Sequence, residues 1–366
     1  MRVPGSEEWI RAGVAAALLG TLGLGVWLRW ALAGGLALPL DFAHLRHAHS
    51  HLGYYGILLP LAWRAWRRAG APVPSGRTGV LYAVATSVAV VGFLRAGYGP
   101  EAIAGSTVVG AVWLTSAARL RARTWAARDL LAPVLPAVVA ALACVPMIAL
   151  RLDSDPATAY AFVATFLAIL LLGVAVPSAL LAQGATVRHA PAWGVTALLG
   201  AAALGAWPAA PARAALLAYG LGLAAAARTA SGEAWLRAAW FLVAAGLSGM
   251  ALGVLPDTHP VVIGAIHFLV LGPVLGGLAL SGRGVPGSRG GWLYLGAVGV
   301  LTLPLVLQGL GAGAWTRTVS AWGGTLVLAS WTAMLLVPGG PLTRDSSDPA
   351  STARAARPDL LPESDP

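Results

Sequence analysis

The chain has few of the residues on which disulfide-rich domains and many soluble enzymes depend. Only 10% of its 366 residues are charged, lysine is absent, and Cys144 is the single cysteine. One cysteine excludes an intramolecular disulfide and any CxxC metal or redox motif. The sequence also contains no Walker-type phosphate loop, HExxH zinc motif or serine nucleophile elbow. The chain therefore offers none of the common motifs for nucleotide binding or hydrolysis.

Apolar residues are abundant instead. They make up 58% of the chain, and runs of roughly twenty residues, long enough to cross a bilayer, repeat from near the N-terminus to about Val337. All 24 basic residues are arginine, and the net charge is +10. A basic patch for nucleic acid would need a soluble face, which this composition hardly leaves. We predict an all-α, polytopic membrane protein that binds lipid and no nucleic acid.

Breaks at charged residues, proline and glycine divide the chain into about twelve transmembrane helices. Together they form one transmembrane domain, residues 1–337. Residues 338–366 are rich in Pro, Ser and Asp, which predicts a disordered cytoplasmic tail. The predicted helices are 10–28, 45–66, 78–96, 100–118, 130–150, 157–182, 191–207, 211–228, 234–255, 260–280, 291–310 and 317–337.

The distribution of arginine among the loops predicts the orientation of these helices in the membrane. When the loops are assigned alternately to two sides, 18 arginines fall on one side and 6 on the other, which together account for all 24. By the positive-inside rule, the richer side is cytoplasmic. This distribution predicts that both termini are cytoplasmic. It also places most histidines near the outer surface, with His189 in an inner loop.

The stretch from 41 to 56, DFAHLRHAHSHLGYYG, holds four of the seven histidines. On a helix of about 100° per residue, His44, His47 and His51 lie within one arc of about 60°, whereas His49 points away. Three imidazoles therefore share a face. This density favours metal or haem binding, and a proton relay or pH-sensing surface is the alternative.

The expected depths of the histidines below the outer surface match this stretch with the tenth helix. His259 is expected at the surface, because Pro260 suits a first helical position, and His267 lies roughly 12 Å deeper. His51 lies roughly 10 Å below His44, at a matching depth. Paired imidazoles on two helices can hold a haem iron from both faces. We predict His51 and His267 as haem ligands, with His47 the substitute for His51.

The remaining histidines could form a second site. Copper or zinc needs three or four nitrogens close together, which a shallower set could provide. Haem propionates are negatively charged and need positively charged partners. The candidates on the outer side are Arg46, Arg95 and Arg29. The predicted residues of the second metal site are His44, His47, His49 and His259.

Two motifs carry a resemblance to a known family. HAHSHLGYYG in the second helix and AIHFLVLGPVLGGLALSGR in the tenth of twelve resemble the NnrS family and its larger relatives, the haem–copper oxidase catalytic subunits. The resemblance implies a low-spin b-type haem between those helices, copper, nitric oxide metabolism and the bacterial inner membrane. His47-Ala48-His49 corresponds to the family's His-Ala-His run.

Departures from the family limit what the resemblance implies. The sixth and seventh predicted helices contain no histidine, and the tenth has no His-x-His pair. Ordinary oxygen reduction at a haem–copper centre is therefore not expected. Ser50 also stands where the NnrS pattern has an acid after His-Ala-His, so a different ligand set is open.

The sequence favours a membrane haem protein, with or without copper, in electron transfer or nitric oxide-related redox chemistry. An oxidoreductase is therefore the favoured enzyme class. A copper or zinc transporter and a haem-free metal-dependent membrane enzyme remain alternatives. Quinol and cytochrome are both open as electron donors. The substrate and the oligomeric state are left undetermined.

Overall fold

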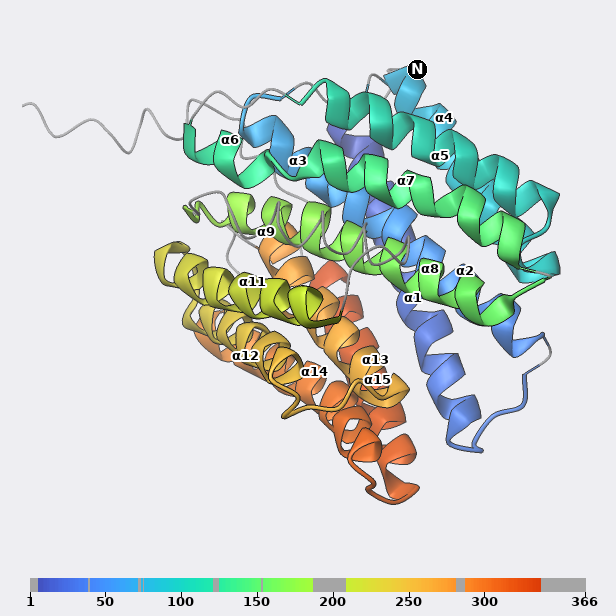
Figure 1. The fold of residues 1–366 in the computed structure, drawn as a ribbon, viewed down its shortest axis with the longest axis vertical. Helices are drawn as coiled ribbons and strands as arrows, with labels where there is room; N and C mark the ends of the chain where they lie inside the picture. Colours follow the sequence, from blue (N-terminus) through green and yellow to red (C-terminus); the bar gives the residue numbers. More distant parts are fainter. Residues whose placement is uncertain are drawn as a thin grey trace, which may run out of the picture.

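The protein is a bundle of helices in the computed structural model (Figure 1). The structure describes residues 6–38, 40–71, 74, 76–120, 125–152, 154–186, 209–280 and 287–336, and these contain no β-strand. Ten described helices are long and apolar enough to cross a membrane. The prediction of an all-α, multi-pass membrane protein is therefore confirmed.

The helices follow the chain as α-helical and short π-helical (η) segments. In order they are α1 (Ser6–Leu32), α2 (Phe42–His51), η1 (Leu52–Leu58), α3 (Leu59–Arg68), α4 (Gly76–Ala96), α5 (Pro100–Ala118), α6 (Trp125–Leu131), α7 (Val134–Arg151), α8 (Pro156–Leu170), η2 (Leu171–Ala175), α9 (Val176–Ala182), α11 (Ala209–Thr229), α12 (Ala234–Ala251), α13 (His259–Leu269), η3 (Val270–Val274), η4 (Gly276–Leu280), α14 (Gly287–Gly309) and α15 (Trp315–Leu336). Eleven of the twelve predicted helices coincide with these elements. The predicted helix 191–207, His189 and the tail 338–366 lie outside the described residues.

Neighbours in sequence pack as helical hairpins, α4 with α5, α7 with α8, α11 with α12 and α14 with α15. Figure 1 shows α4, α5 and α7 on one side of the bundle and α11 to α15 on the other. Helix α1 packs against both α2 and α15. Trp30 of α1 donates a hydrogen bond to Thr325 of α15 at 3.1 Å, which ties the first helix to the last.

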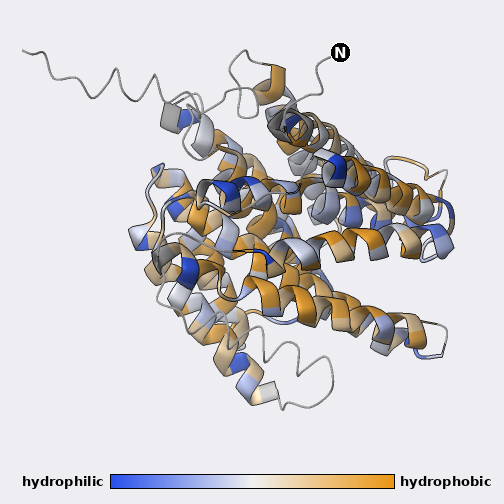
Figure 2. Ribbon diagram, turned by 90° about the horizontal axis from the view of Figure 1, so that it is seen from above, coloured by the Kyte–Doolittle hydropathy of each residue, from blue (hydrophilic) through white to orange (hydrophobic). Residues whose placement is uncertain are grey.

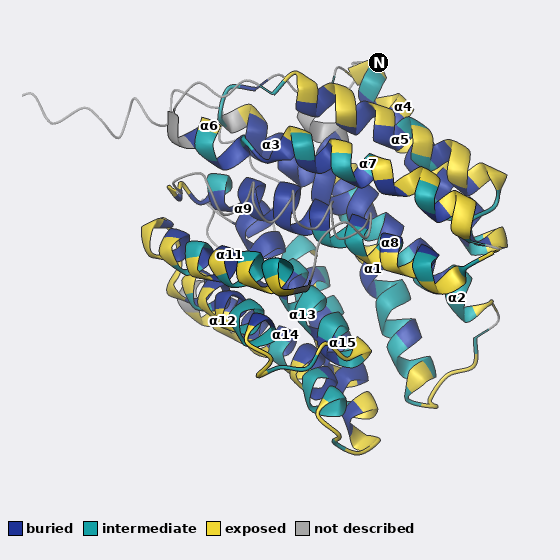
Figure 3. Ribbon diagram, viewed as in Figure 1, coloured by how far each residue is buried: buried dark blue, intermediate teal, exposed yellow. Residues whose placement is uncertain are grey.

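The helix that runs from α2 through η1 to α3 lies in the interior. Its charged and polar residues exclude it from the ten apolar spans. Leu61, Trp63 and Trp66 of α3 are nonetheless fully buried, and Trp66 donates a hydrogen bond to Ser178 of α9. Figure 3 shows the contrast with α4 and α5, which carry many exposed residues. Neighbouring helices rather than lipid surround this segment, so it tolerates polar side chains.

Three of the four described π-helical segments, η1, η2 and η3, are associated with a proline. Pro60 and Pro177 are the second residues of α3 and α9, directly after η1 and η2, and Pro273 lies inside η3. Proline has no N–H to donate, and its ring crowds the carbonyl four residues earlier, so the helix widens there. Two of these regions follow the histidines, because η1 begins directly after His51 and η3 begins three residues after His267. Such π-helical turns often mark functional sites.

Apolar residues predominate along the helices (Figure 2). On α4 the exposed side chains include Val80, Val84, Val88 and Val91, which recur every three or four residues. This spacing places them on one face. An exposed apolar stripe of this length suits contact with lipid rather than water.

Candidate functional site

Helix α2 begins at an N-cap that sets the position of its histidines. The Asp41 carboxylate accepts hydrogen bonds from the backbone N–H groups of Ala43 and His44, at 2.8 and 3.0 Å. The bonds from His44 and Ala43 hold the pKa of the Asp41 carboxyl below its ordinary value. A carboxylate here also faces the positive end of the helix dipole. The first turn of α2, and with it His44, is therefore held by a charged cap.

One side of α2 faces α4 and the α4–α5 turn. The His51 ring lies 3.9 Å from the Phe93 ring, centre to centre, and the His47 ring lies 4.7 Å from that of Tyr98. His47 and His51 are both buried. His44 is beside Gly97, where a Cβ atom would lie 3.0 Å from the His44 ring. These three imidazoles share one side of the helix, as their spacing predicts, and aromatic rings pack against His47 and His51.

Tyr98 completes this aromatic side. It lies in the turn between α4 and α5, and its ring contacts the rings of His47, His51 and Phe93. Burial raises the pKa of Tyr98, so its hydroxyl stays protonated and neutral at physiological pH. The side of α2 that bears His47 and His51 is therefore closely packed with aromatic rings.

The other side of α2 bears His49, which faces α1 and α13. Its Nδ1 is 2.9 Å from the backbone oxygen of Thr21 in α1. Gly25, one turn further along α1, leaves room for the ring, because a Cβ atom there would lie 2.8 Å from His49 Cε1. The ring centre of His49 is 6.1 Å from that of His267, and the two ring planes are 12° from parallel. His49 and His267 therefore form a close pair across two helices.

His267 is oriented in the same way as His49. Its Nδ1 is 2.8 Å from the backbone oxygen of Ile263, one turn earlier in α13. A carbonyl oxygen only accepts, so Nδ1 carries the proton in each ring, and Nε2 keeps its lone pair. Metal-binding histidines characteristically donate their other N–H to such a partner. Both rings are half-buried, and Nε2 is the nitrogen through which each could bind a metal.

The depth argument predicted that His51 and His267 face each other, but the structure does not bring them together. The imidazole beside His267 is that of His49, whereas the His51 ring is stacked on Phe93. Residues two apart on a helix point in directions about 200° apart, so His49 and His51 cannot face the same neighbour. The depth argument named the two helices that meet here, and the side of α2 that faces His267 is the one with His49. His47, the predicted substitute, lies on the same side as His51.

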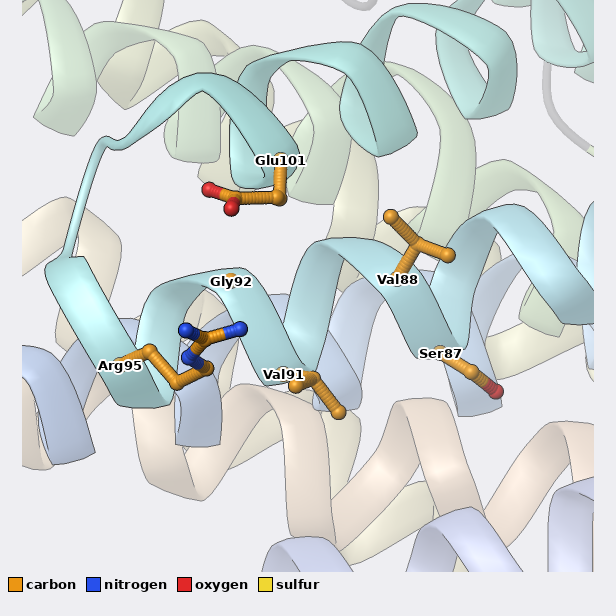
Figure 4. Close-up of a pocket in the computed structure, with 6 residues that line it drawn as sticks. All are labelled: Ser87, Val88, Val91, Gly92, Arg95 and Glu101. Carbon is orange, nitrogen blue, oxygen red and sulfur yellow. The ribbon is translucent and has the colours of Figure 1, made fainter.

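The three candidate arginines lie in different surroundings. Arg29, in the last turn of α1, is close enough to His49 and His267 to interact electrostatically with both. The Arg46 guanidinium lies over the Tyr160 ring, 5.9 Å from its centre. Arg95 lines a pocket of about 260 Å³ between α4 and α5, with Glu101 (Figure 4). Of the three, Arg29 is the one placed at the histidine pair.

The predicted second metal site does not assemble. Across the described ranges, no group of three or more His, Cys, Asp or Glu side chains comes together to hold a metal ion. His259 begins α13 and is exposed, His49 faces away from His44 and His47, and His47 is packed against Tyr98. The set His44, His47, His49 and His259 is therefore divided among three surroundings.

The chain matches no protein-family model and no curated protein. The resemblance to the NnrS family and the haem–copper oxidases stays a prediction that rests on the two histidine motifs and on the expected helix number. The candidate site must therefore be judged on its own geometry.

Sequence reasoning missed what α1 contributes. Thr21 supplies the carbonyl that orients His49, and Gly25 supplies the space for its ring. A signal existed in the α1 sequence GTLGLG, where Gly20, Gly23 and Gly25 recur within six residues. Small residues of this kind let a neighbouring helix or ring approach closely.

Proposed function

We propose that this protein is a multi-pass membrane haem protein that acts in electron transfer, with His49 and His267 as the axial ligands of one haem. The two ring centres are 6.1 Å apart and the ring planes are 12° from parallel. This close approach of two imidazoles from distant parts of the chain, each with Nδ1 at a backbone carbonyl oxygen, is the observation that carries the proposal.

The chain's own groups suit this role. Each carbonyl bond at Nδ1 fixes the tautomer and orientation of its ring before any ligand binds. Arg29 supplies a positive charge near both rings, where it would stabilise a propionate. Arg46 and Arg95 are assigned no part in this site.

The ligand arrangement favours electron transfer over reaction at the metal. When bound, haem would supply a one-electron redox centre, and His49 and His267 would hold it from two helices. With both ligands supplied by the protein, the haem would pass electrons on to any centre at which nitric oxide reacts. The prediction that the protein also binds copper stays a prediction.

We also infer twelve spans, with both termini in the cytoplasm. Ten apolar helices, the buried helix from Phe42 to Arg68 and the predicted helix 191–207 make up this number. The 18 to 6 division of arginine supports the orientation. We further infer the bacterial plasma membrane as the location. Reporter fusions at the two termini would test the orientation, and a reporter that folds only outside the cytoplasm should stay inactive at both.

The absorption spectrum of the purified full-length protein, oxidised and reduced, tests the haem proposal. We expect a haem Soret band that shifts on reduction, and His267→Ala should abolish it. His259→Ala is the matched control, because His259 lies on the same helix, is exposed and has no part in the pair. This variant should keep the full spectrum.

Metal analysis of the same sample separates the alternatives. Haem iron in a one-to-one ratio with the protein supports the proposal. A colourless protein with bound zinc or copper would favour the metal transporter, and iron without haem would favour the haem-free enzyme. Either of these results would end the haem proposal.

A further inference from the structure

The pocket between α4 and α5 has no part in the histidine site. Its lining consists of Ser87, Val88, Val91, Gly92, Arg95 and Glu101, and its volume is about 260 Å³. Figure 4 shows the Arg95 guanidinium and the Glu101 carboxylate directed toward the space beside Gly92. Both charges lie at helix ends, Arg95 in the last turn of α4 and Glu101 in the first turn of α5. They therefore stand where the apolar spans end, at the depth of lipid headgroups.

The two charges share the pocket without neutralising each other. Both residues are described and exposed, and no ion pair joins them. A cation and an anion that face one space but do not bond to each other are complementary to a ligand that itself carries both charges. An anionic ligand would be repelled by Glu101, and a cationic ligand by Arg95.

The apolar part of the pocket continues along α4. Val91, Val88 and Val84 follow Arg95 at intervals of three or four residues, and all three are exposed. From Arg95 to Val84 the helix rises by roughly 16 Å, close to the roughly 15 Å that one leaflet of hydrocarbon occupies. A chain that lies along this stripe would thus run from the headgroup region to the middle of the bilayer.

The wall of the pocket is rigid because α4 and α5 pack closely. A Cβ atom at Gly92 would lie 2.5 Å from the backbone nitrogen of Ala102. At Gly105 it would lie 2.6 Å from the backbone oxygen of Ala85. Two glycines therefore bring the helices into backbone contact along one side of the stripe. A pre-formed groove binds a ligand without the cost of ordering it first.

We propose that this pocket binds one molecule of a zwitterionic phospholipid with a primary ammonium group, phosphatidylethanolamine. Arg95 binds the phosphate, because a guanidinium offers paired donors to phosphate oxygens. Glu101 accepts hydrogen bonds from the ammonium group, which has three N–H donors. One acyl chain lies along Val91, Val88 and Val84. This site does not depend on whether the protein binds haem.

Lipid retention tests the proposal. The full-length protein would be reconstituted in phosphatidylcholine vesicles that contain a minor share of phosphatidylethanolamine. After extraction in mild detergent, lipids on the intact protein would be identified by native mass spectrometry. We expect about tenfold preferential retention of phosphatidylethanolamine, because the quaternary ammonium of phosphatidylcholine has no N–H to donate to Glu101. Equal retention of both lipids would overturn the proposal.

Variants test the two charges separately. Glu101→Gln should remove the preference and leave some retention of both lipids, whereas Arg95→Gln should reduce retention of both about tenfold. The matched controls are Glu233→Gln at the start of α12 and Arg317→Gln near the start of α15. Both residues are exposed and lie at helix ends. The controls should retain lipid as the wild type does.

A third variant tests the groove without changing charge. Val88→Trp fills the space beside Gly92 and should reduce lipid retention, while the protein stays monodisperse because Val88 is exposed. Unchanged retention in Val88→Trp would overturn the placement of the acyl chain. Retention of anionic phosphatidylglycerol that does not respond to Glu101→Gln, or co-purification of a quinone that Arg95→Gln removes, would overturn the identity of the ligand.

Discussion

The two sides of α2 differ in number of histidines and in what they face. The side with His44, His47 and His51 packs against aromatic residues of α4 and the α4–α5 turn. The other side has one histidine, His49, which lies nearly parallel to His267. The side with fewer histidines is thus the one that faces a histidine of another helix. A high local density of histidines therefore does not by itself show which of them meets a histidine on a neighbouring helix.

The denser side of α2 is closely packed. Phe93 of α4 stacks on His51 at 3.9 Å, centre to centre, and His51 Nδ1 is 2.9 Å from the backbone oxygen of His47. A flat cofactor would have to displace these rings. On the His49 side, half-buried residues and glycines of α1 line the approach instead.

Removal of the histidine on one side of α2 and not on the other should have the largest effect. His49→Gly should abolish haem binding, whereas His51→Gly should leave the haem stoichiometry unchanged. Addition of free imidazole should restore the spectrum of His49→Gly, because the glycine leaves a space for the missing ligand. Loss of haem in His51→Gly with full retention in His49→Gly would reverse our assignment.

Electron paramagnetic resonance tests the geometry of the pair in the unmodified protein. Ring planes 12° from parallel predict a rhombic low-spin signal from the oxidised haem. Perpendicular rings would give a strongly anisotropic signal with one prominent feature at low field. Observation of the second type would show that the two rings do not hold the iron in the relative orientation described.

His51 should contribute to stability rather than to cofactor binding. His51→Ala removes a buried ring that is stacked on Phe93, and we expect a loss of about 2–4 kcal/mol in the free energy of unfolding. His51→Phe keeps an aromatic ring and should recover much of that loss. Thermal unfolding of the two variants in the same detergent measures the difference. Equal stability of His51→Ala and wild type would contradict the packing role.

Gly25 should act through the His49 ring. A methyl group at this position would lie 2.8 Å from His49 Cε1, and overpacking of this kind costs about 1–3 kcal/mol. Gly25→Ala should therefore weaken haem binding about tenfold or more and shift the Soret band. Gly23→Ala is the control, because no atom lies within 4 Å of a Cβ there. The same spectrum in both variants would place the haem away from this part of α1.

Arg29 should affect haem binding less, through charge alone. Arg29→Gln removes a positive charge near both rings, and a partly exposed ion pair contributes up to about 1 kcal/mol. We expect affinity for haem to fall about fivefold in a haem titration. Arg95→Gln should not change it, since Arg95 lines the α4–α5 pocket. Weaker haem binding in Arg95→Gln, with unchanged binding in Arg29→Gln, would place the propionates on the other side of α2.

The cap of α2 should produce the smallest effect, and a pH-dependent one. Since the pKa of folded Asp41 lies below its ordinary value, the ionised cap stabilises the protein above the ordinary carboxyl pKa. This stabilisation is lost as the pH falls through the lower folded value. Asp41→Ala should lower the unfolding temperature slightly at neutral pH. Asp41→Asn, which still caps the helix, should show a weaker fall in stability on acidification than wild type.

Helix positions followed from local composition. Apolar runs between charged, proline and glycine breaks located α4, α5 and α15 within a few residues of the structure. The buried course of α2–α3 was not predicted, because its polar composition alone would suit a surface. Trp63 and Trp66 of this segment are fully buried. Their burial results from the packing of other helices around them.

The sequence by itself determined that the chain is helical and crosses a membrane, and that its histidines gather in two helices. These properties depend on composition and on periodicity along one helix, which are local. The tertiary structure decided that His49 rather than His51 faces His267. The reason is physical: the rotation of α2 about its axis is set by contacts with α1, α4 and α13. Those contacts join residues that the spacing within α2 does not relate.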